Sequence, residues 1–298
     1  MNLSKKIWIL LGLSSIIFHI FLIFSGLIPN LVSRPIHMAL AIPWIILYRK
    51  DSNNRTILDF LLVFLGVFFC LWIAFNHNSI SDQYGFIENN FQLIVSFFLL
   101  ALVLEMARRC VGLPLPIVAF ISIIYGVFGY LIPGEFGHPG IPINSFFGNL
   151  VFAEGGIWGT LTNVSVTIVS IFIIFGCILN AGEAGEGFMN IAKLFAGKLK
   201  GGAAKVSIVS SALFGSISGS ASANVASTGS VTLPTMLKLG YPKRLSGAVE
   251  AVASSGGQIM PPLMGAGAFV MVELTGISYD KIIIASFLPA ILFFFTVW

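Results

Sequence analysis

Long apolar runs recur along the whole sequence, and they limit what this chain can fold into. One helix needs about 20 apolar residues to cross the hydrocarbon core of a bilayer. Charged residues make up only 9% of the chain, against about 25% in a soluble protein, so they are too few to cover a water-exposed surface. The sequence therefore predicts an all-α integral membrane protein, a multi-span helical bundle with the candidate spans 7–28, 31–48, 57–75, 91–107, 113–132, 157–179 and 282–298.

The lysines and arginines indicate how these spans are oriented, because basic loops stay on the cytoplasmic side. With the N-terminus in the cytoplasm, all but two of the 16 basic residues fall on that side, the exceptions being Arg34 and Lys281. The opposite loops, 76–90 and 133–156, contain no lysine or arginine. We therefore expect a multi-pass membrane protein with its N-terminus in the cytoplasm. The weak second span, which Arg34 interrupts, must then cross to place the basic residues Arg49, Lys50 and Arg55 inside.

Residues 206–237 break the simple alternation of spans. Lys205 precedes this segment and Lys238 follows it, so both ends have the composition of a cytoplasmic loop. Its middle, residues 215–224, is rich in glycine and serine. We interpret the segment as a re-entrant helical hairpin that enters from the cytoplasm, turns within the membrane and returns to the same side.

Residues 245–272 form the next apolar segment, which is long for one straight helix. Near its centre stand Gly256, Gly257, Pro261 and Pro262. Glycine and proline weaken or remove helical hydrogen bonds, so the sequence predicts a broken transmembrane helix. Irregular backbone at membrane depth persists only where protein buries it or where it lines a cavity.

The two interruptions offer oxygen ligands of the kind that bind a hard cation such as Na⁺. Free carbonyls at a broken helix can coordinate Na⁺, and helix N-termini can bind an anionic substrate group. The alternative is that the small residues only allow helices to pack closely. The candidate ligands at the hairpin tip and the break are Ser218, Ser220, Ser222, Asn224, Ser254, Ser255 and Gln258.

Two acidic residues within predicted spans have different expected roles. Glu250 lies about two turns before the break, and a carboxylate inside a membrane segment is a candidate for function. It either relays protons or pairs with a basic residue such as Arg244. Glu105 precedes Arg108 and Arg109 by three and four residues, so we expect an ion pair at a helix end.

Four stretches of the sequence resemble motifs of the same protein family. The hairpin tip reads GSISGSASANVASTG over residues 215–229, and the break reads AVEAVASSGGQIMPPLMGA over residues 248–266. LEMARRCVGLP at 104–114 and FGYLIPG at 128–134 accompany them. Together they resemble the permeases of tripartite ATP-independent periplasmic (TRAP) transporters, most closely the branch that fuses the small and large subunits. The resemblance covers roughly residues 90–298, and before it only a four-span layout is similar.

The resemblance implies an elevator-type transporter, in which a mobile domain carries substrate and ions across a static scaffold. It implies an extracytoplasmic solute-binding protein of the TAXI type, organic-acid substrates, Na⁺ as the coupling ion and no cofactor. Residues 1–110 would form a scaffold similar to the small subunit, and residues 111–298 the first half of a transport module similar to the large subunit. The residues that it assigns to cation and substrate binding are Ser218, Gly219, Ser220, Ser222, Asn224, Thr228, Ser254, Ser255, Gly257, Gln258, Pro261 and Pro262.

The chain departs from the two-subunit branch at two of these positions. That branch usually has an aspartate where this chain has Asn224, and a serine where it has Leu263. Loss of a charge and a hydroxyl can change the number or identity of the coupled ions, so Na⁺ is favoured over H⁺ without being fixed. Such permeases are also longer than this chain, so the resemblance implies an N-terminal fragment that lacks the second hairpin and the second broken helix.

Other function classes fit the sequence less well. An intramembrane serine protease needs a base within hydrogen-bond reach of its nucleophile, yet residues 139–298 contain no histidine. Glycine-rich re-entrant segments also build channel filters, but the length of the motif match favours a transporter, and we expect no enzyme. The cysteines lack metal-ligand spacing and the basic residues are dispersed, so we expect no transition-metal site and no nucleic-acid partner. We expect His19, inside the first span, to be a packed neutral histidine without a partner.

Overall fold

The computed structural model describes residues 3–48 and 55–298, and every regular element within these ranges is helical. The chain divides into two compact units, Met1–Thr167 and Ile168–Trp298, and each is described by itself below. Arg49 and Lys50, part of the predicted cytoplasmic cluster, lie outside the described residues.

Seven helical segments of the described ranges are long and apolar enough to cross a membrane. They match the predicted spans to within a few residues at each end, which confirms an all-α multi-span membrane protein. These segments are Lys5–Phe24, Asn30–Tyr48, Ile57–Phe75, Asn90–Val111, Pro114–Leu131, Thr160–Leu179 and Tyr279–Val297.

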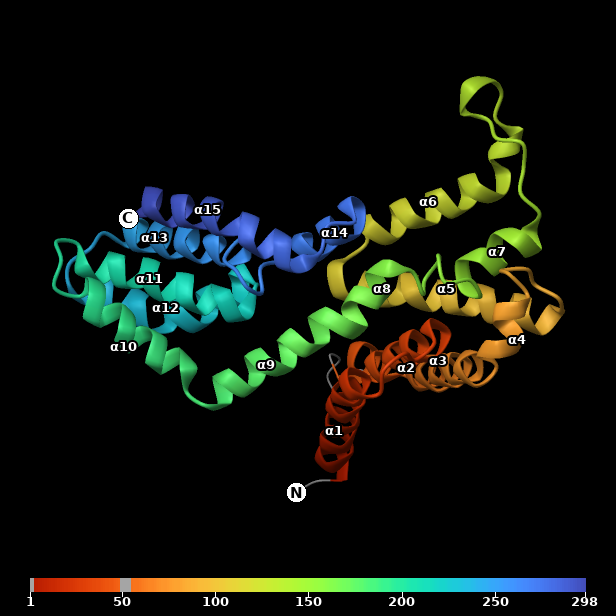
Figure 1. The fold of residues 1–298 in the computed structure, drawn as a ribbon, viewed down its shortest axis with the longest axis horizontal. Coiled ribbons are helices and arrows are strands. Elements are labelled where there is room, and N and C mark those ends of the chain that lie inside the picture. The colour runs from red at the N-terminus through yellow and green to blue at the C-terminus, as the bar shows by residue number, and fades with distance from the viewer. Residues whose placement is uncertain (1–2, 49–54) are drawn as a thin grey trace. The chain divides into compact units, whose positions relative to one another are not determined.

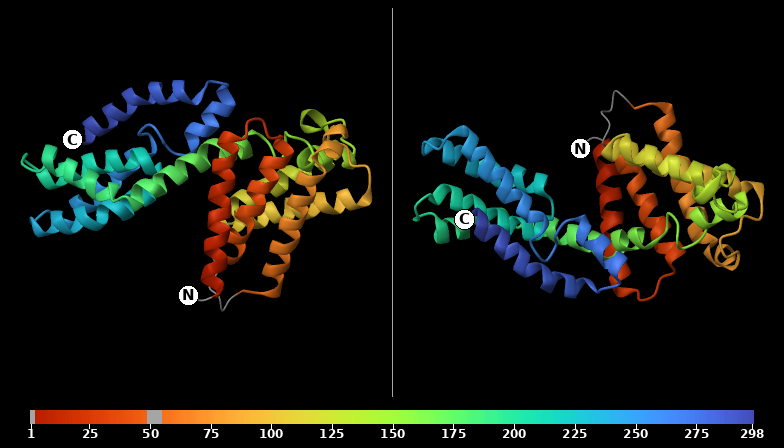
Figure 2. Two further views of the ribbon diagram at one scale, coloured as in Figure 1. Left: turned by 60° about the horizontal axis from the view of Figure 1, so that its bottom comes forward. Right: turned by 90° about the horizontal axis from the view of Figure 1, so that it is seen from above.

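The first unit is organised around three closely packed helices, α2, α3 and α5. Its buried core includes Ile42, Ile73 and Leu99 from these helices. α1 contributes little to that core and leaves most of its apolar surface open beside α2 (Figure 2). The main helices of the unit are α1 (Leu3–Phe24), α2 (Asn30–Pro43), α3 (Ile57–Phe75), α4 (His77–Asp82), α5 (Asn90–Val111), α6 (Pro114–Phe128), α7 (Ile143–Val151) and α8 (Thr160–Val164). A π-helical turn (Trp44–Tyr48) extends α2, and another (Ser165–Val169) follows α8.

The arginine that weakened the second span is satisfied inside the first unit. Arg34 is 4% exposed, and its guanidinium donates to the backbone carbonyls of Glu154 and Trp158. Asn30 donates to the Glu154 carboxylate over 2.7 Å. A buried arginine is tolerated in a membrane helix when protein carbonyls replace its water, so Arg34 does not prevent this segment from being a span.

Ion pairs at the C-terminal end of α5 agree with the ion pair predicted for Glu105. Glu105 accepts from both Arg108 and Arg109 at 2.7 Å. Arg109 also pairs with Asp59 at 2.7 Å, and Asp59 forms a capping box with Thr56 at the start of α3. The ion pair that was expected within one helix therefore also ties α5 to α3.

The expectation that His19 lacks a partner is wrong. His19 Nε2 lies 2.7 Å from His37 Nδ1, and His37 Nε2 lies 3.1 Å from the hydroxyl of Ser165. The other nitrogen of His19 faces the carbonyl of Ser15 at 2.7 Å. The partner was missed because His37 is 18 residues away in the sequence, on a different helix.

The first compact unit extends beyond the predicted boundary at residue 110. Phe147 and Val151 of α7 are buried in the same core as α5, and so is Trp158 in the loop that follows. These residues were predicted to belong to the transport module. The assignment of a scaffold to residues 1–110 remains a prediction about function, which the packing of α7 neither requires nor excludes.

The second unit contains the two interrupted segments. Its helices are α9 (Ser170–Ala181), α10 (Ala184–Ala196), α11 (Gly202–Ser218), α12 (Ala221–Lys238), α13 (Lys243–Ser255), α14 (Ala266–Thr275) and α15 (Tyr279–Val297). α11 and α12 form a helical hairpin, and α13 packs against both of its arms (Figure 1).

α10 packs small residues against α11. Ala192 and Ala196 are fully buried and pack with Met189 and Val206. Ile191 and Phe195, which follow helical spacing, are exposed instead. Small side chains occupy the buried face because they let two helix backbones approach closely.

Candidate functional site

The hairpin turns through only two residues. α11 ends at Ser218, Gly219 adopts a left-handed conformation with φ of 58°, and Ser220 begins α12. The Ser220 hydroxyl accepts the backbone N–H of Ala223 at 3.3 Å as an N-cap. A Cβ on Gly219 would lie 2.0 Å from the carbonyl oxygen of Met264, so both the backbone conformation and the available space require glycine here.

The predicted break in the next helix is present. α13 ends at Ser255, one 3₁₀ turn follows (Gly256–Gln258), and residues 259–265 are irregular until α14 begins. Within this loop the N–H of Gly265 donates to the carbonyl of Gln258 over 2.7 Å. The Tyr279 hydroxyl lies 2.7 Å from the carbonyl oxygens of Pro262 and Leu263. Tyr279 therefore holds the irregular backbone from the start of α15.

The hairpin and the break touch at two glycines. A Cβ on Gly215 would lie 2.3 Å from Gly257 Cα, and a Cβ on Gly257 would lie 2.5 Å from Asn224 Nδ2. Asn224 is fully buried and donates through Nδ2 to the carbonyl of Ser211 over 2.8 Å. The N–H of Leu263 donates to the carbonyl of Ser216 at 3.3 Å. The two interruptions, predicted separately from the sequence, thus lie against each other.

The tip carries a hydroxyl that the protein does not satisfy. The Ser218 oxygen is buried and has no hydrogen-bond partner among the described residues. Ser220 and Ser222 lie beside it in the chain, with their hydroxyl oxygens 3.2 Å apart. Buried polar atoms are normally paired, so an unpaired one at this position points to a ligand.

The N-termini of α12 and α14 lie close together. α12 begins just after Gly219 and α14 just after Gly265, and a Cβ on Gly265 would lie 3.5 Å from the Gly219 carbonyl oxygen. Helix N-termini carry unpaired N–H groups and a partial positive charge, which favour an anion. The tip therefore combines oxygen atoms suited to a cation with helix ends suited to an anion.

Not every predicted residue joins this site. Ser255 is exposed and donates to the carbonyl of Ala251 over 2.8 Å, within its own helix. Asn224 uses its nitrogen to brace the hairpin, and its amide oxygen lies 3.4 Å from the Thr228 hydroxyl. Thr228 and Ser254 lie one to two turns away, in a separate polar cluster.

That cluster surrounds Glu250, which is 1% exposed. Ser207 of α11 donates to Oε2 over 2.7 Å, and Thr228 of α12 donates to Oε1 over 2.6 Å. Thr232 of α12 also donates to Oε2, and the hydroxyl of Ser254 lies 3.3 Å from Oε1. Four hydroxyls from three helices therefore bind one carboxyl group.

The alternative that Glu250 pairs with Arg244 does not hold. Arg244 is exposed, and no basic side chain among the described residues forms an ion pair with Glu250. The two residues are six positions apart on α13, and so on different faces of that helix.

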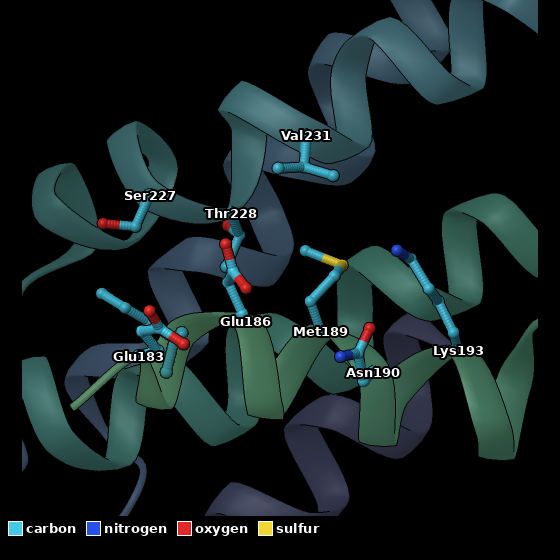
Figure 3. Close-up of a pocket in the computed structure, with 10 residues that line it drawn as sticks. Glu183, Glu186, Met189, Asn190, Lys193, Ser227, Thr228 and Val231 are labelled. Atoms are coloured by element: carbon cyan, nitrogen blue, oxygen red, sulfur yellow. The ribbon is translucent and has the colours of Figure 1, made fainter. Parts of the chain in front are cut away.

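A cavity of about 540 Å³ lies between α10 and α12. Figure 3 shows Glu186, Met189 and Lys193 of α10 on one side, with Thr228 and Val231 of α12 across from them. A smaller cavity of about 160 Å³ borders the same two helices and reaches Thr232. Each cavity is therefore lined by a threonine whose hydroxyl binds Glu250.

Sequence reasoning missed three residues of these sites, Ser207, Thr232 and Tyr279. A signal existed for the first two, because Ser207 precedes Ser211 by four residues and Thr232 follows Thr228 by four. That spacing puts each pair on one helix face. Tyr279 gave no such signal, since it contacts the break from a helix that begins 17 residues after Pro262.

The comparisons with known proteins point to one family. The family model described as "Tripartite ATP-independent periplasmic transporter, DctM component" matches residues 98–298. No solved structure matches significantly.

Curated relatives match part of the chain. The isethionate TRAP transporter permease protein DctMQ of Oleidesulfovibrio alaskensis is 31% identical over 134 residues, which is 45% of this chain and 21% of that protein. The ectoine TRAP transporter large permease protein TeaC of Halomonas elongata is 32% identical over 128 residues, 43% of this chain and 30% of that protein. The sialic acid TRAP transporter permease protein SiaT of Haemophilus influenzae is 29% identical over 133 residues, 45% of this chain and 21% of that protein.

The matched segment covers less than a third of the length of each of these relatives. The family model nevertheless spans well over half of this chain, including the hairpin, the break and the Glu250 cluster. The family consists of solute transporter permeases of the inner membrane, which work with a periplasmic solute-binding protein and are not enzymes. On these grounds the chain belongs to the TRAP transporter permeases, DctM component.

Proposed function

We propose that this chain is the permease component of a cation-coupled secondary transporter that imports organic acids delivered by an extracytoplasmic binding protein. In this proposal the hairpin 206–237 is re-entrant, the N-terminus is cytoplasmic, and the hairpin tip and helix break bind Na⁺ together with the substrate. The mobile part moves across the membrane as an elevator, and the binding protein is of the TAXI type of the fused branch.

The observation that carries the proposal is the unpaired hydroxyl of Ser218. It lies where the hairpin tip meets the irregular backbone of the helix break. Unpaired polar groups in hydrocarbon cost several kcal/mol each, so the arrangement is stable when a ligand completes it. A hard cation is the ligand that hydroxyl and carbonyl oxygens favour.

The N-termini of α12 and α14 support an anionic substrate beside the cation. Isethionate and sialic acid, named in two of the relatives, are both organic acids. C4-dicarboxylates, named in a further relative from Pseudomonas aeruginosa, share the anionic group. A cation bound at the tip would also offset the charge of such a substrate.

The test is uptake by the full-length permease in proteoliposomes with its binding protein, using radiolabelled isethionate, sialic acid and C4-dicarboxylates. Uptake should require an inward Na⁺ gradient. Gln258→Leu or Ser220→Ala should raise the half-saturating Na⁺ concentration by about tenfold, the effect of about 1.4 kcal/mol. Ser230→Ala, an exposed serine on α12, is the matched control and should leave it unchanged. Uptake that ignores Na⁺ and stops when the proton gradient is collapsed would contradict the Na⁺ assignment.

A further inference from the structure

Glu250 is a buried carboxyl group that forms no ion pair with a basic side chain of residues 3–48 or 55–298. A single charge buried without compensation is unfavourable, so such a group is paired or changes its protonation. None of the charged side chains on the surrounding elements contacts it, and the Lys205 ammonium instead lies 4.6 Å from the centre of the Trp298 ring. These charged residues are Glu183, Glu186 and Lys193 at α10, Lys205 on α11, Lys238 on α12, Lys243 and Arg244 on α13, and Asp280 and Lys281 on α15.

The two threonine hydroxyls around Glu250 also have a backbone carbonyl within reach. The Thr228 hydroxyl lies 2.6 Å from Glu250 Oε1 and 2.8 Å from the carbonyl oxygen of Asn224. The Thr232 hydroxyl contacts Oε2 and lies 2.9 Å from the carbonyl oxygen of Thr228. A hydroxyl has one hydrogen and can also accept, so each threonine must choose between the carboxyl group and the backbone.

Because of this choice, the cluster can satisfy its hydrogen bonds in two protonation states of Glu250. When Glu250 is ionised, both threonine hydrogens point to the carboxylate. When Glu250 is neutral, its own O–H donates to one threonine oxygen, and the hydrogen of that threonine turns to the backbone carbonyl. No helix has to move, and no buried polar group loses its partner.

The same geometry favours a proton over Na⁺ at this position. The carboxylate oxygens and the hydroxyl oxygens of Ser207 and Thr228 already lie within direct hydrogen-bond distance, 2.6 to 2.7 Å. A metal ion between them would have to push these oxygens apart, whereas a proton adds no volume. The compact packing of Gly229, where a Cβ would lie 3.2 Å from Glu250 Cγ, leaves no spare room.

A route to the carboxyl group exists through the two threonines. Thr228 lines the cavity of about 540 Å³ under α10, and Thr232 lines the cavity of about 160 Å³ beside it. Glu183 and Glu186 line the larger cavity together with Lys193, so acidic side chains outnumber basic ones there. The hydroxyls therefore lie between Glu250 and space that water can enter.

We propose that Glu250 binds and releases a proton during the transport cycle, and that Thr228 and Thr232 pass this proton to and from the cavities under α10. This inference rests on the proposed transport function and adds a proton site to the cation site at the hairpin tip. A hydronium ion in the cavity transfers a proton to the threonine oxygen. The hydrogen that the hydroxyl carried before is transferred to the carboxylate oxygen. The products are water and a neutral carboxyl group, so atoms and charge balance.

The proton site also has a connection to the tip. In the neutral state Thr228 donates to the carbonyl of Asn224, the residue that braces the hairpin against Ser211. In the ionised state that donation is lost. Protonation at Glu250 therefore changes hydrogen bonding one turn from the tip, without any change in the fold.

The test is infrared difference spectroscopy of the purified full-length permease in lipid nanodiscs, recorded as the pH is stepped without any substrate. We expect a pH-dependent carboxyl C=O band that is lost in Glu250→Gln and kept in Glu135→Gln, an exposed glutamate of the first unit. Thr228→Val keeps the shape of the side chain and removes one hydrogen bond, so it should shift the band and slow its response to a pH jump by about tenfold. This variant tests the proposal even if Glu250→Gln does not fold.

Two results would overturn the inference: a pH-dependent band that persists in Glu250→Gln, or one that Thr228→Val leaves unchanged in both position and rate. Binding of radioactive Na⁺ to the wild-type protein separates this failure from that of the proposed function. Saturable Na⁺ binding with no Glu250 band would retain the Na⁺ site and reject the proton site. A Glu250 band without Na⁺ binding would reject the Na⁺ assignment and retain the proton site.

Discussion

Asn224 lies where the hairpin and the helix break meet. Its nitrogen donates to the Ser211 carbonyl, a bond that an aspartate cannot make, because an ionised carboxylate only accepts. This accounts in physical terms for the amide at a position where the two-subunit branch usually has an acid. The amide nitrogen braces the two arms of the hairpin.

Gly257 allows this contact, and its replacement should break it. A Cβ there would lie 2.5 Å from Asn224 Nδ2 and 2.9 Å from Gly215 Cα. Gly257→Ala should therefore lower the free energy of unfolding by about 1–3 kcal/mol, the usual effect of overpacking a tight contact. The control is Gly247→Ala on α13, where nothing lies within 4 Å of an added Cβ.

Thermal unfolding of both variants in detergent checks the contact between Gly215 and Gly257. The control should be as stable as the wild type or slightly more so, because alanine favours a helix over glycine. Equal stability of Gly257→Ala and Gly247→Ala would show that the hairpin and the break do not press together there.

The hairpin is an element whose two ends carry the same charge. Lys200 and Lys205 stand at its start, and Lys238 and Lys243 follow its end. α11 and α12 have 17 and 18 residues, and a two-residue turn joins them, so the start of α11 and the end of α12 lie at the same end of the hairpin. Either arm alone is slightly short for a full crossing.

Single-cysteine labelling tests the orientation of the hairpin. In a variant without Cys70, Cys110 and Cys177, Lys200→Cys and Lys243→Cys should react with an impermeant maleimide only after the cytoplasmic side is opened. Glu135→Cys, in a loop expected outside, should react in intact cells and serves as the control. Labelling of the two lysine positions from opposite sides would exclude a re-entrant hairpin.

For the molecule as a whole, the sequence predicted the spans and both interruptions because these features are local. Apolar length marks the spans, and Gly219, Gly257 and Pro262 mark the points where helices end. The family model confirms the resemblance that the motifs around the tip and the break carried.

The rest depends on contacts between distant segments. His37 and Tyr279 meet partners 18 and 17 residues away, and the four hydroxyls at Glu250 come from three helices. These contacts join different helices, so the spacing of residues along one helix cannot predict them. The alternative that Glu250 pairs with Arg244 does not hold, because a spacing of six residues places the two on different faces of α13.

Equilibrium binding of radioactive Na⁺ to the purified full-length permease is the most direct test that the tip and the break form a cation site. The account predicts saturable Na⁺ binding that is about tenfold weaker in Ser218→Ala and unchanged in Ser230→Ala, an exposed serine of the same hairpin. Absence of saturable Na⁺ binding, or equal affinity in Ser218→Ala and the wild type, would contradict it.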